Sequence, residues 1–235
     1  MKNRSLFLAA LLMVMVLMLD IVPACADNSY AKQYPYKAVA QMNIKYECGC
    51  RRTGSGTMVG RRGLITAGHN LICPYHSRWA SEIQFKFGIK NSRDCLYTYT
   101  GRYTMHVYDT FKNGYNSAND IGYVVFSKDV GKTTGWYGIY APSDYDLSDE
   151  RFHMTAYDSG NMFTDWMYLY TSSSNSFTFY TRQSASALGA GIFVEDEGSS
   201  GPTLLGVYTT YGGGKCYGRK VTQNIINDMR KNGGI

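Results

Sequence analysis

Hydrophobic and polar residues alternate in short runs along almost the whole chain. The runs are rich in Val, Ile, Tyr, Phe and Thr, and clusters of Gly, Asn, Asp and Ser separate them. A period of two places hydrophobic side chains on one face of a strand, so the pattern predicts an all-β protein. Strands are expected at residues 38–45, 53–59, 63–66, 82–87, 96–107, 121–126, 152–156, 167–171, 176–181, 191–194 and 204–208.

Helical periodicity is confined to the C-terminal end. Residues 222–231 place Ile225, Ile226 and Met229 on one side, which predicts one amphipathic helix. The regular spacing of the strands is typical of a sandwich or a barrel. The clearest interruption is residues 127–136, whose Lys, Asp, Gly and Thr content predicts a linker between two halves. The 21 tyrosines are expected to pack as ordinary strand residues.

The first residues of the chain predict export. A cationic start precedes an apolar run at residues 6–19 and a small-residue sequence ending at Ala26, which is the order of a secretory signal peptide. The run is short for a bilayer span, so we expect cleavage of residues 1–26, a short N-terminal segment at 27–36, and a secreted protein without a membrane span. In the alternative, Cys25 carries a lipid anchor, although the neighbouring proline and aspartate fit a lipobox poorly.

Charge and cysteine content narrow the classes of function. The net charge is +6, yet the basic residues are scattered and no nucleic-acid-binding signature accompanies them, so no nucleic-acid partner is expected. The chain has six cysteines, and removal of Cys25 leaves five, an odd number. Cys48 and Cys50 could begin a zinc site, but no second close pair completes a tetrahedral set, so neither a metal nor a cofactor is predicted.

Two motifs carry candidate chemistry. A glycine-bordered strand at residues 54–60 is followed by a strand that ends in Thr-Ala-Gly-His, whose histidine is His69. Small residues before the histidine let the backbone approach other groups closely. Further along, Asp120 directly precedes an apolar strand. A carboxylate that accepts a hydrogen bond from a histidine ring fixes its tautomer and stabilises its protonated form.

These two motifs, in this order, resemble the histidine and aspartate segments of the trypsin-like serine proteases, above all the bacterial glutamyl endopeptidases. Residues 133–138, 154–157 and 206–208 extend the resemblance. It implies two six-stranded Greek-key β-barrels, the first at residues 37–127 and the second, with the C-terminal helix, at 128–235. It also implies that His69 and Asp120 are the catalytic base and the acid that orients it.

The nucleophile of that family has no counterpart here. The family pattern Gly-x-Ser-Gly-x-Pro matches residues 186–191, so Leu188 stands in the place of the serine and Ser186 in that of the first glycine. Leucine has no heteroatom, so no acyl-enzyme can form on it. Ser200 is an alternative nucleophile, although its motif is one residue short and reads better as a hairpin turn. A shift of register would offer Ser186 or Ser184 instead.

The resemblance assigns the remaining site residues. The backbone N–H groups of Ser186 and Leu188 would form the oxyanion hole. Gln183 and Tyr208 would line the primary specificity pocket, where glutamate-specific relatives keep a threonine and a histidine, so specificity for acidic residues is not implied.

Three functions are compatible with these observations. The first is a secreted serine protease homologue without proteolytic activity, whose inter-barrel cleft holds a peptide or protein segment. The second is an active secreted serine endopeptidase, and the third is a surface interaction or adhesion protein. We also expect Cys73 to form a disulfide with Cys48 or Cys50, because the strands between them should return the chain to the same place beside His69.

Overall fold

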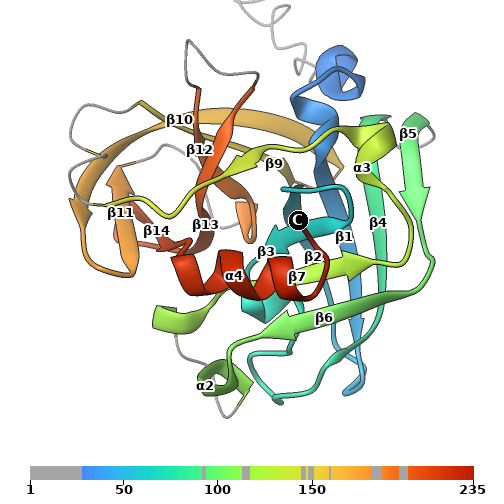
Figure 1. The fold of residues 1–235 in the computed structure, drawn as a ribbon, viewed down its shortest axis with the longest axis horizontal. Coiled ribbons are helices and arrows are strands. Elements are labelled where there is room, and N and C mark those ends of the chain that lie inside the picture. Colours follow the sequence, from blue (N-terminus) through green and yellow to red (C-terminus); the bar gives the residue numbers. More distant parts are fainter. Residues whose placement is uncertain are drawn as a thin grey trace, which may run out of the picture.

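Strands dominate the structure, as the alternating pattern predicts. Figure 1 shows the computed structural model, in which two sheets lie side by side and the C-terminal helix α4 (Gln223–Lys231) crosses in front of them. The expected all-β class and the terminal helix are confirmed. The structure describes residues 28–91, 94–112, 117–143, 147, 151–158, 160–180, 187–195 and 201–235.

Seven strands form the first sheet, each antiparallel to its neighbours, in the order β5-β4-β1-β2-β3-β7-β6. The strand predicted at residues 96–107 is in fact two strands. A turn at Gly101 separates them, because this glycine packs against the ring of Tyr99, whose Cζ would lie 2.8 Å from a Cβ atom there. The strands are β1 (Val39–Tyr46), β2 (Arg51–Met58), β3 (Gly63–Thr66), β4 (Ala80–Asn91), β5 (Asp94–Tyr99), β6 (Tyr103–Val107) and β7 (Gly122–Phe126).

The second sheet has the order β12-β9-β10-β11-β14-β13-β8. An additional pairing between β12 and β13 closes six of these strands into a ring, and β8 joins β13 in parallel. The hydrophobic pattern of the sequence does not predict β8, β14 or the first half of β10. The strands are β8 (Gly138–Ile139), β9 (Phe152–Asp158), β10 (Asn161–Ser172), β11 (Ser176–Tyr180), β12 (Gly191–Val194), β13 (Thr203–Gly212) and β14 (Lys215–Lys220).

The connection between the sheets contains a packed helical turn. Residues 127–136, predicted as a linker, include α3 (Gly131–Thr134), in which Gly131 and Thr134 are buried. A Cβ atom on Gly131 would lie 2.8 Å from the carbonyl oxygen of Gly60, so glycine allows α3 to lie directly against the β2–β3 turn. The connection is therefore held against the first sheet.

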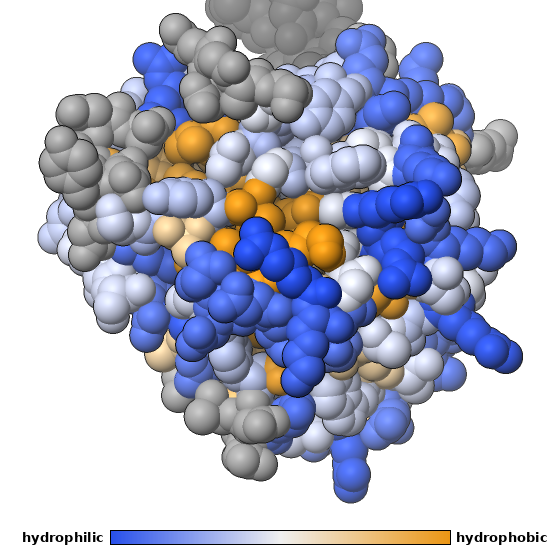
Figure 2. All heavy atoms as spheres, viewed as in Figure 1, coloured by the Kyte–Doolittle hydropathy of each residue, from blue (hydrophilic) through white to orange (hydrophobic). Residues whose placement is uncertain are grey.

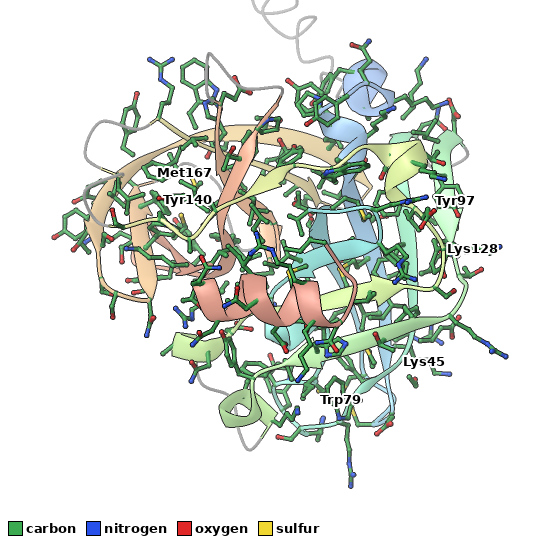
Figure 3. All side chains as sticks on the ribbon, viewed as in Figure 1. Lys45, Trp79, Tyr97, Lys128, Tyr140 and Met167 are labelled. Carbon is green, nitrogen blue, oxygen red and sulfur yellow. The ribbon has the colours of Figure 1, made fainter. Side chains whose placement is uncertain are left out.

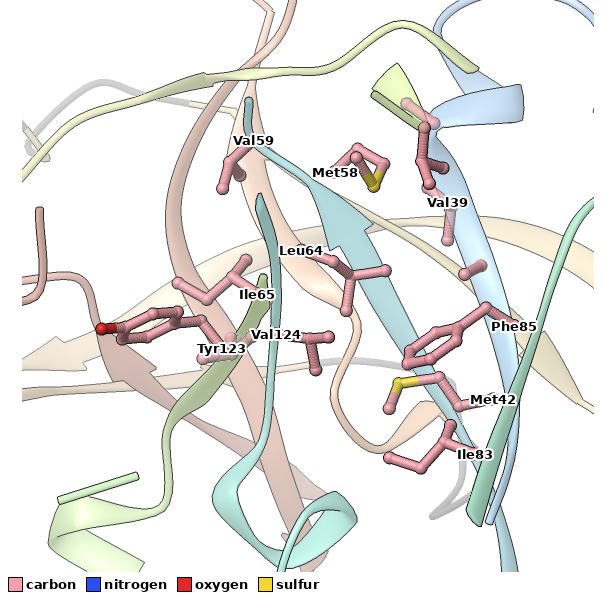
Figure 4. Packing of buried hydrophobic residues seen from close by; sticks show 14 of the residues in the cluster. Val39, Met42, Met58, Val59, Leu64, Ile65, Ile83, Phe85, Tyr123 and Val124 are labelled. Carbon is pink, nitrogen blue, oxygen red and sulfur yellow. The ribbon is translucent and has the colours of Figure 1, made fainter. Parts of the chain in front are cut away.

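Phe85 belongs to the core of the first sheet, part of which is shown in Figure 4. Its ring is fully buried and makes edge-to-face contacts with Phe126 and Tyr103, at centroid distances of 4.9 and 5.4 Å. The same hydrophobic cluster includes Phe193 and Leu204 from the second sheet, so the two halves pack directly against each other. A second cluster fills the interior of the other barrel.

Helix α4 covers one side of the molecule with its apolar face. Ile225, Ile226 and Met229 are buried beneath it, as their spacing predicts. Its outer surface is mainly hydrophilic in Figure 2, beside a hydrophobic area at the centre of this view. Within the described part of the chain, none of the helices combines the length and the apolar character that a membrane crossing needs.

We expect Phe85→Ala to lower the free energy of unfolding by about 3–5 kcal/mol, because it leaves a ring-sized cavity in a packed core. The matched control is Tyr168→Ala, since Tyr168 is an aromatic strand residue with 71% of its surface exposed. The control should change stability by less than about 0.5 kcal/mol. Urea unfolding of both variants measures this, and equal losses would contradict the description of the core.

Candidate active site

His69 lies at the junction of the sheets, directly after β3. It belongs to the short 3-10 helix η3 (Gly68–Asn70). Its backbone N–H donates to Oδ1 of Asp120 over 2.8 Å, and its Nδ1 lies 2.7 Å from Oδ2 of the same carboxylate. The two side chains are 3% and 0% exposed. The predicted contact between His69 and Asp120 is present, while their catalytic role stays a prediction.

Close packing fixes the histidine on both sides. A Cβ atom on Gly68 would lie 3.2 Å from the ring of Phe111 and 3.3 Å from Oδ1 of Asp120, so a small residue suits the position before His69. The hydroxyl of Tyr46 donates to the backbone carbonyl of His69 over 2.6 Å. Burial raises the pKa of Tyr46, which keeps its hydroxyl protonated and able to donate.

The turn that carries Leu188 is tied to the first sheet through its backbone. The carbonyl oxygen of Leu188 accepts hydrogen bonds from the N–H of Ser55 over 2.9 Å and from Nδ2 of Asn70 over 3.2 Å. The N–H of Gly191 donates to Oγ1 of Thr57 over 3.1 Å. None of these contacts uses the side chain of Leu188, which packs, partly buried, against the hydrophobic cluster of the second barrel.

Gly189 is the tightest point of this turn. Its φ is +88°, and a Cβ atom would lie 2.3 Å from both the carbonyl oxygen of Ser55 and Nδ2 of Asn70. Its N–H donates to the carbonyl of Tyr208 over 2.8 Å. Glycine is therefore required both for the backbone conformation and for the close approach of the two sheets.

A cavity of about 250 Å³ opens beside the histidine. His69 and Leu188 line it together, so the structure places Leu188 next to the histidine. Nε2 of His69 is buried and has no hydrogen-bond partner among the described residues. This nitrogen faces no hydroxyl or thiol in the part of the chain that the structure describes. The remaining lining residues are Arg52, Pro74, Tyr75, Thr209 and Thr210.

Solved structures that resemble this arrangement of sheets include three proteases. A Glu endopeptidase in complex with MPD matches with a TM-score of 0.70 at 15% identity, over 85% of this chain and 91% of that one. The protease Anisep from Arthrobacter nicotinovorans matches with a TM-score of 0.68 at 14% identity, over 83% and 94%. A thermostable serine protease, AL20, gives a TM-score of 0.65 at 11% identity, over 83% and 96%.

The chain has the trypsin-like serine protease fold. No protein-family model matches its sequence. Among curated proteins, an extracellular metalloprotease of Bacillus subtilis (strain 168) is 24% identical over 211 residues, which cover 86% of this chain. The match covers 65% of the length of that relative.

The other residues predicted for the site separate into two groups. Ser186, Ser184, Gln183 and Ser200 lie outside the described residues. Tyr208 is described and is fully buried in the core of the second barrel, and it does not line the cavity beside His69. Its assignment to a specificity pocket stays a prediction.

Polar residues form hydrogen bonds between the two sheets, and the sequence pattern does not single these residues out. Asn70 donates to Leu188 and also to Oγ1 of Thr66, over 2.9 Å, and Oγ of Ser55 accepts from the N–H of Tyr157 over 3.0 Å. The only signal for Asn70 is its place directly after the histidine. The bonds from Asn70 to Leu188 and from Tyr157 to Ser55 join segments far apart in the chain, so no local pattern could have revealed them.

The cysteines also differ from expectation. The five described cysteines are free thiols, so the disulfide predicted for Cys73 is not present in this part of the chain. Cys73 does lie beside Cys48 and Cys50, as the return of the chain predicts. The premise that no further ligand pair exists near Cys48 and Cys50 is wrong, because Cys73 and His76 complete a set of four.

We expect Gly189→Ala to destabilise the protein by about 3 kcal/mol or more, because it adds a steric clash to an unfavourable φ. The matched control is Gly160→Ala, since Gly160 has nearly the same φ, +87°, and nothing within 4 Å of the added Cβ. The control should lose only about 1–2 kcal/mol from the backbone conformation. Thermal and urea unfolding of both variants separates the two effects, and equal losses would show that the junction tolerates a side chain.

Proposed function

We propose that this protein is an exported protease homologue that does not hydrolyse peptide bonds and that binds a peptide segment in the cleft beside His69. One observation supports the proposal: Leu188, which the resemblance to serine proteases puts in the place of the nucleophile, lies in a turn that is bonded to the first sheet and lines the same cavity as His69. Export rests on the signal-peptide pattern of residues 1–26, which lie outside the described residues.

Leucine at this position removes the covalent route to hydrolysis. A serine protease needs an O–H group whose proton passes to Nε2 of the histidine while the oxygen attacks the carbonyl carbon. The side chain of Leu188 offers only hydrocarbon to the cavity that it shares with His69. Without the nucleophile, the acceleration that remains comes from binding and from any oxyanion-hole donors.

The lining of the cleft suits a peptide. Thr209 and Thr210 supply polar groups, and Tyr75, which is 78% exposed, supplies an aromatic surface at the rim. Arg52 is the charged residue among the lining side chains. An arginine binds carboxylates through paired hydrogen bonds, so we infer that the preferred peptide carries an acidic group at this point.

An active endopeptidase that uses Ser200 is the main rival. The described residues on either side of Ser200 argue against it, because Val194 pairs with Thr203 at the end of the β12–β13 hairpin remote from Leu188. Gly191, which adjoins the Leu188 turn, lies about 10 Å further along β12 at the usual strand rise. Ser186 is the alternative nucleophile closest in sequence to this turn.

A second candidate, a surface interaction protein, has an observation of its own. Strand β10 and its neighbours expose a row of aromatic rings on the second barrel. Tyr168, for example, pairs with Tyr180 on β11, and both are exposed. The other large aromatic residues exposed on β10 are Trp166 and Tyr170, and Tyr217 is exposed on β14, which pairs with β11.

The test of the first proposal is chemical labelling and cleavage. We expect the wild type to resist a fluorophosphonate probe and to leave a peptide library intact. Leu188→Ser should give weak or no hydrolysis, because Ser186 and Gly191 still depart from the family motif and misplaced donors can cost about a hundredfold in rate. Leu188→Ser combined with Ser186→Gly should cleave measurably faster, and Gly191 is kept because its N–H donates to Thr57 and proline has none.

Labelling or cleavage by the wild type would overturn this proposal. Ser186→Ala and Ser200→Ala then serve to find the nucleophile, since loss of activity in one of them identifies it. Circular dichroism of each variant confirms folding, so that inactivity is not mistaken for unfolding.

Peptide binding is tested by selecting ligands for the wild type from a peptide library and measuring their affinities by calorimetry. We expect Arg52→Gln to weaken binding of acidic peptides at least about tenfold, because it removes a charge-assisted pair. Arg51→Gln is the matched control, since Arg51 is the adjacent residue on β2 and does not line this cavity. Peptides that bind Arg52→Gln as tightly as the wild type but bind Tyr168→Ala more weakly would indicate that the exposed aromatic surface is the binding site.

A further inference from the structure

Four potential metal ligands meet at one end of the first barrel. Cys48 and Cys50 lie in the turn between β1 and β2, and Cys73 and His76 lie in the loop that follows η3. One ligand atom from each of the four lies within 4.8 Å of all the others. Cys73 is buried, Cys50 is half-buried, and Cys48 and His76 are exposed. The cluster is thus anchored in the core and still open to an ion from solvent.

The two nitrogen–sulfur distances from His76 match those of a tetrahedral site. Nδ1 of His76 lies 3.6 Å from Sγ of Cys50 and 3.5 Å from Sγ of Cys73. With zinc–sulfur bonds of about 2.3 Å and a zinc–nitrogen bond of about 2.0–2.1 Å, tetrahedral angles separate sulfur and nitrogen by about 3.6 Å. The ligand atoms therefore need little movement to bind a zinc ion.

Backbone hydrogen bonds hold the two segments in place without any metal. The N–H of Glu47 donates to the carbonyl of Trp79 over 2.9 Å, and the N–H of Cys73 donates to the carbonyl of Arg78 over 2.7 Å. Figure 3 labels Trp79 and Lys45, which mark this end of the barrel. The loop is closed further by the N–H of Ser77, which donates to the carbonyl of Cys73 over 2.9 Å. The site is therefore largely formed before an ion arrives.

We propose that Cys48, Cys50, Cys73 and His76 bind one zinc ion in a structural site. Three thiolates and an imidazole are ligands that favour zinc over magnesium or calcium. Four protein ligands leave no open position for water or substrate, which is typical of structural zinc. The site is separate from the His69–Asp120 pair and does not depend on the proposed function.

A disulfide is the competing use of the same sulfur atoms. It would join only two of the three cysteines and leave the third thiol and His76 without a role. A zinc ion engages all four side chains and accounts for the odd number of cysteines that meet here. A zinc ion is favoured over a disulfide because it would use all four side chains, whereas a disulfide would use only two.

The proposed ion would also support the cleft. Pro74 and Tyr75, which line the cavity beside His69, lie in sequence between the ligands Cys73 and His76. A metal ion bound to Cys73 and His76 would hold both ends of this segment and so restrict the positions of Pro74 and Tyr75 in the cleft. Zinc at this site would therefore stabilise one side of the cleft without touching the ligand held there.

The experiment measures metal in the protein purified under reducing conditions without chelator. We expect about one zinc per chain by elemental analysis, and a visible absorption spectrum typical of tetrahedral thiolate coordination after replacement by Co²⁺. Zinc added to metal-free protein should raise the melting temperature by at least about 5 °C, because it binds only the folded state.

The variants identify the ligands. His76→Asn and Cys48→Ser remove exposed groups, so both should fold, and each should lower the affinity for Co²⁺ at least about tenfold. Cys95→Ser is the matched control, because Cys95 lies on β5 with its Sγ 3.2 Å from Oγ1 of Thr98 and is not part of the cluster. It should bind Co²⁺ like the wild type.

Three results would overturn the proposal. The first is wild-type protein that takes up neither Zn²⁺ nor Co²⁺, and the second is uptake that the Cys48 and His76 variants leave unchanged. The third is a disulfide between two of the three cysteines, found by peptide mass mapping in protein that is exposed to air with Zn²⁺ present and contains no metal.

Discussion

The structure depends on how closely the two barrels approach each other at Gly189. At that point the carbonyl of Leu188 accepts hydrogen bonds from Ser55 and Asn70, across a junction from which a side chain at position 189 is excluded. A buried carbonyl that lost both donors would carry the full cost of its desolvation, about 1–3 kcal/mol. These backbone bonds hold the turn that contains Leu188 against the first sheet, while the Leu188 side chain packs against the second hydrophobic cluster.

The sequence predicted the parts of the fold that local patterns encode. His69 and Asp120 could be placed because each sits in a short motif beside a strand. Strand β14 could not, because Lys215–Lys220 contains mostly polar residues and is a strand only through its pairing with β11 and β13. Gly218 within it allows Ile192 to pack closely, since a Cβ atom would lie 2.4 Å from that side chain. A contact of this kind cannot be predicted from the alternation of hydrophobic and polar residues in the sequence.

The cluster of Cys48, Cys50, Cys73 and His76 is a second feature that the sequence reveals only in part. Cys48 and Cys50 are visible as a close pair, and Cys73 and His76 as a second pair three residues apart. The whole of β2 and β3 lies between the two pairs in the sequence. The hairpin that returns the chain to His69 predicts the approach of Cys73, but the side of the loop on which His76 lies depends on the fold.

Retention of His69 and Asp120 does not by itself argue for catalysis. Asp120 is fully buried and accepts hydrogen bonds from the backbone N–H and from the ring of His69. Removing one side chain of the pair would leave buried polar atoms of the other without that hydrogen bond, at a cost of about 1–3 kcal/mol. The contact therefore stabilises the fold whether or not the site is catalytic. Nε2 of His69 is different, because it has no hydrogen-bond partner among the described residues. A buried polar atom of this kind is a cost to the folded state, and a ligand in the cleft that donates to it or accepts from it would offset that cost.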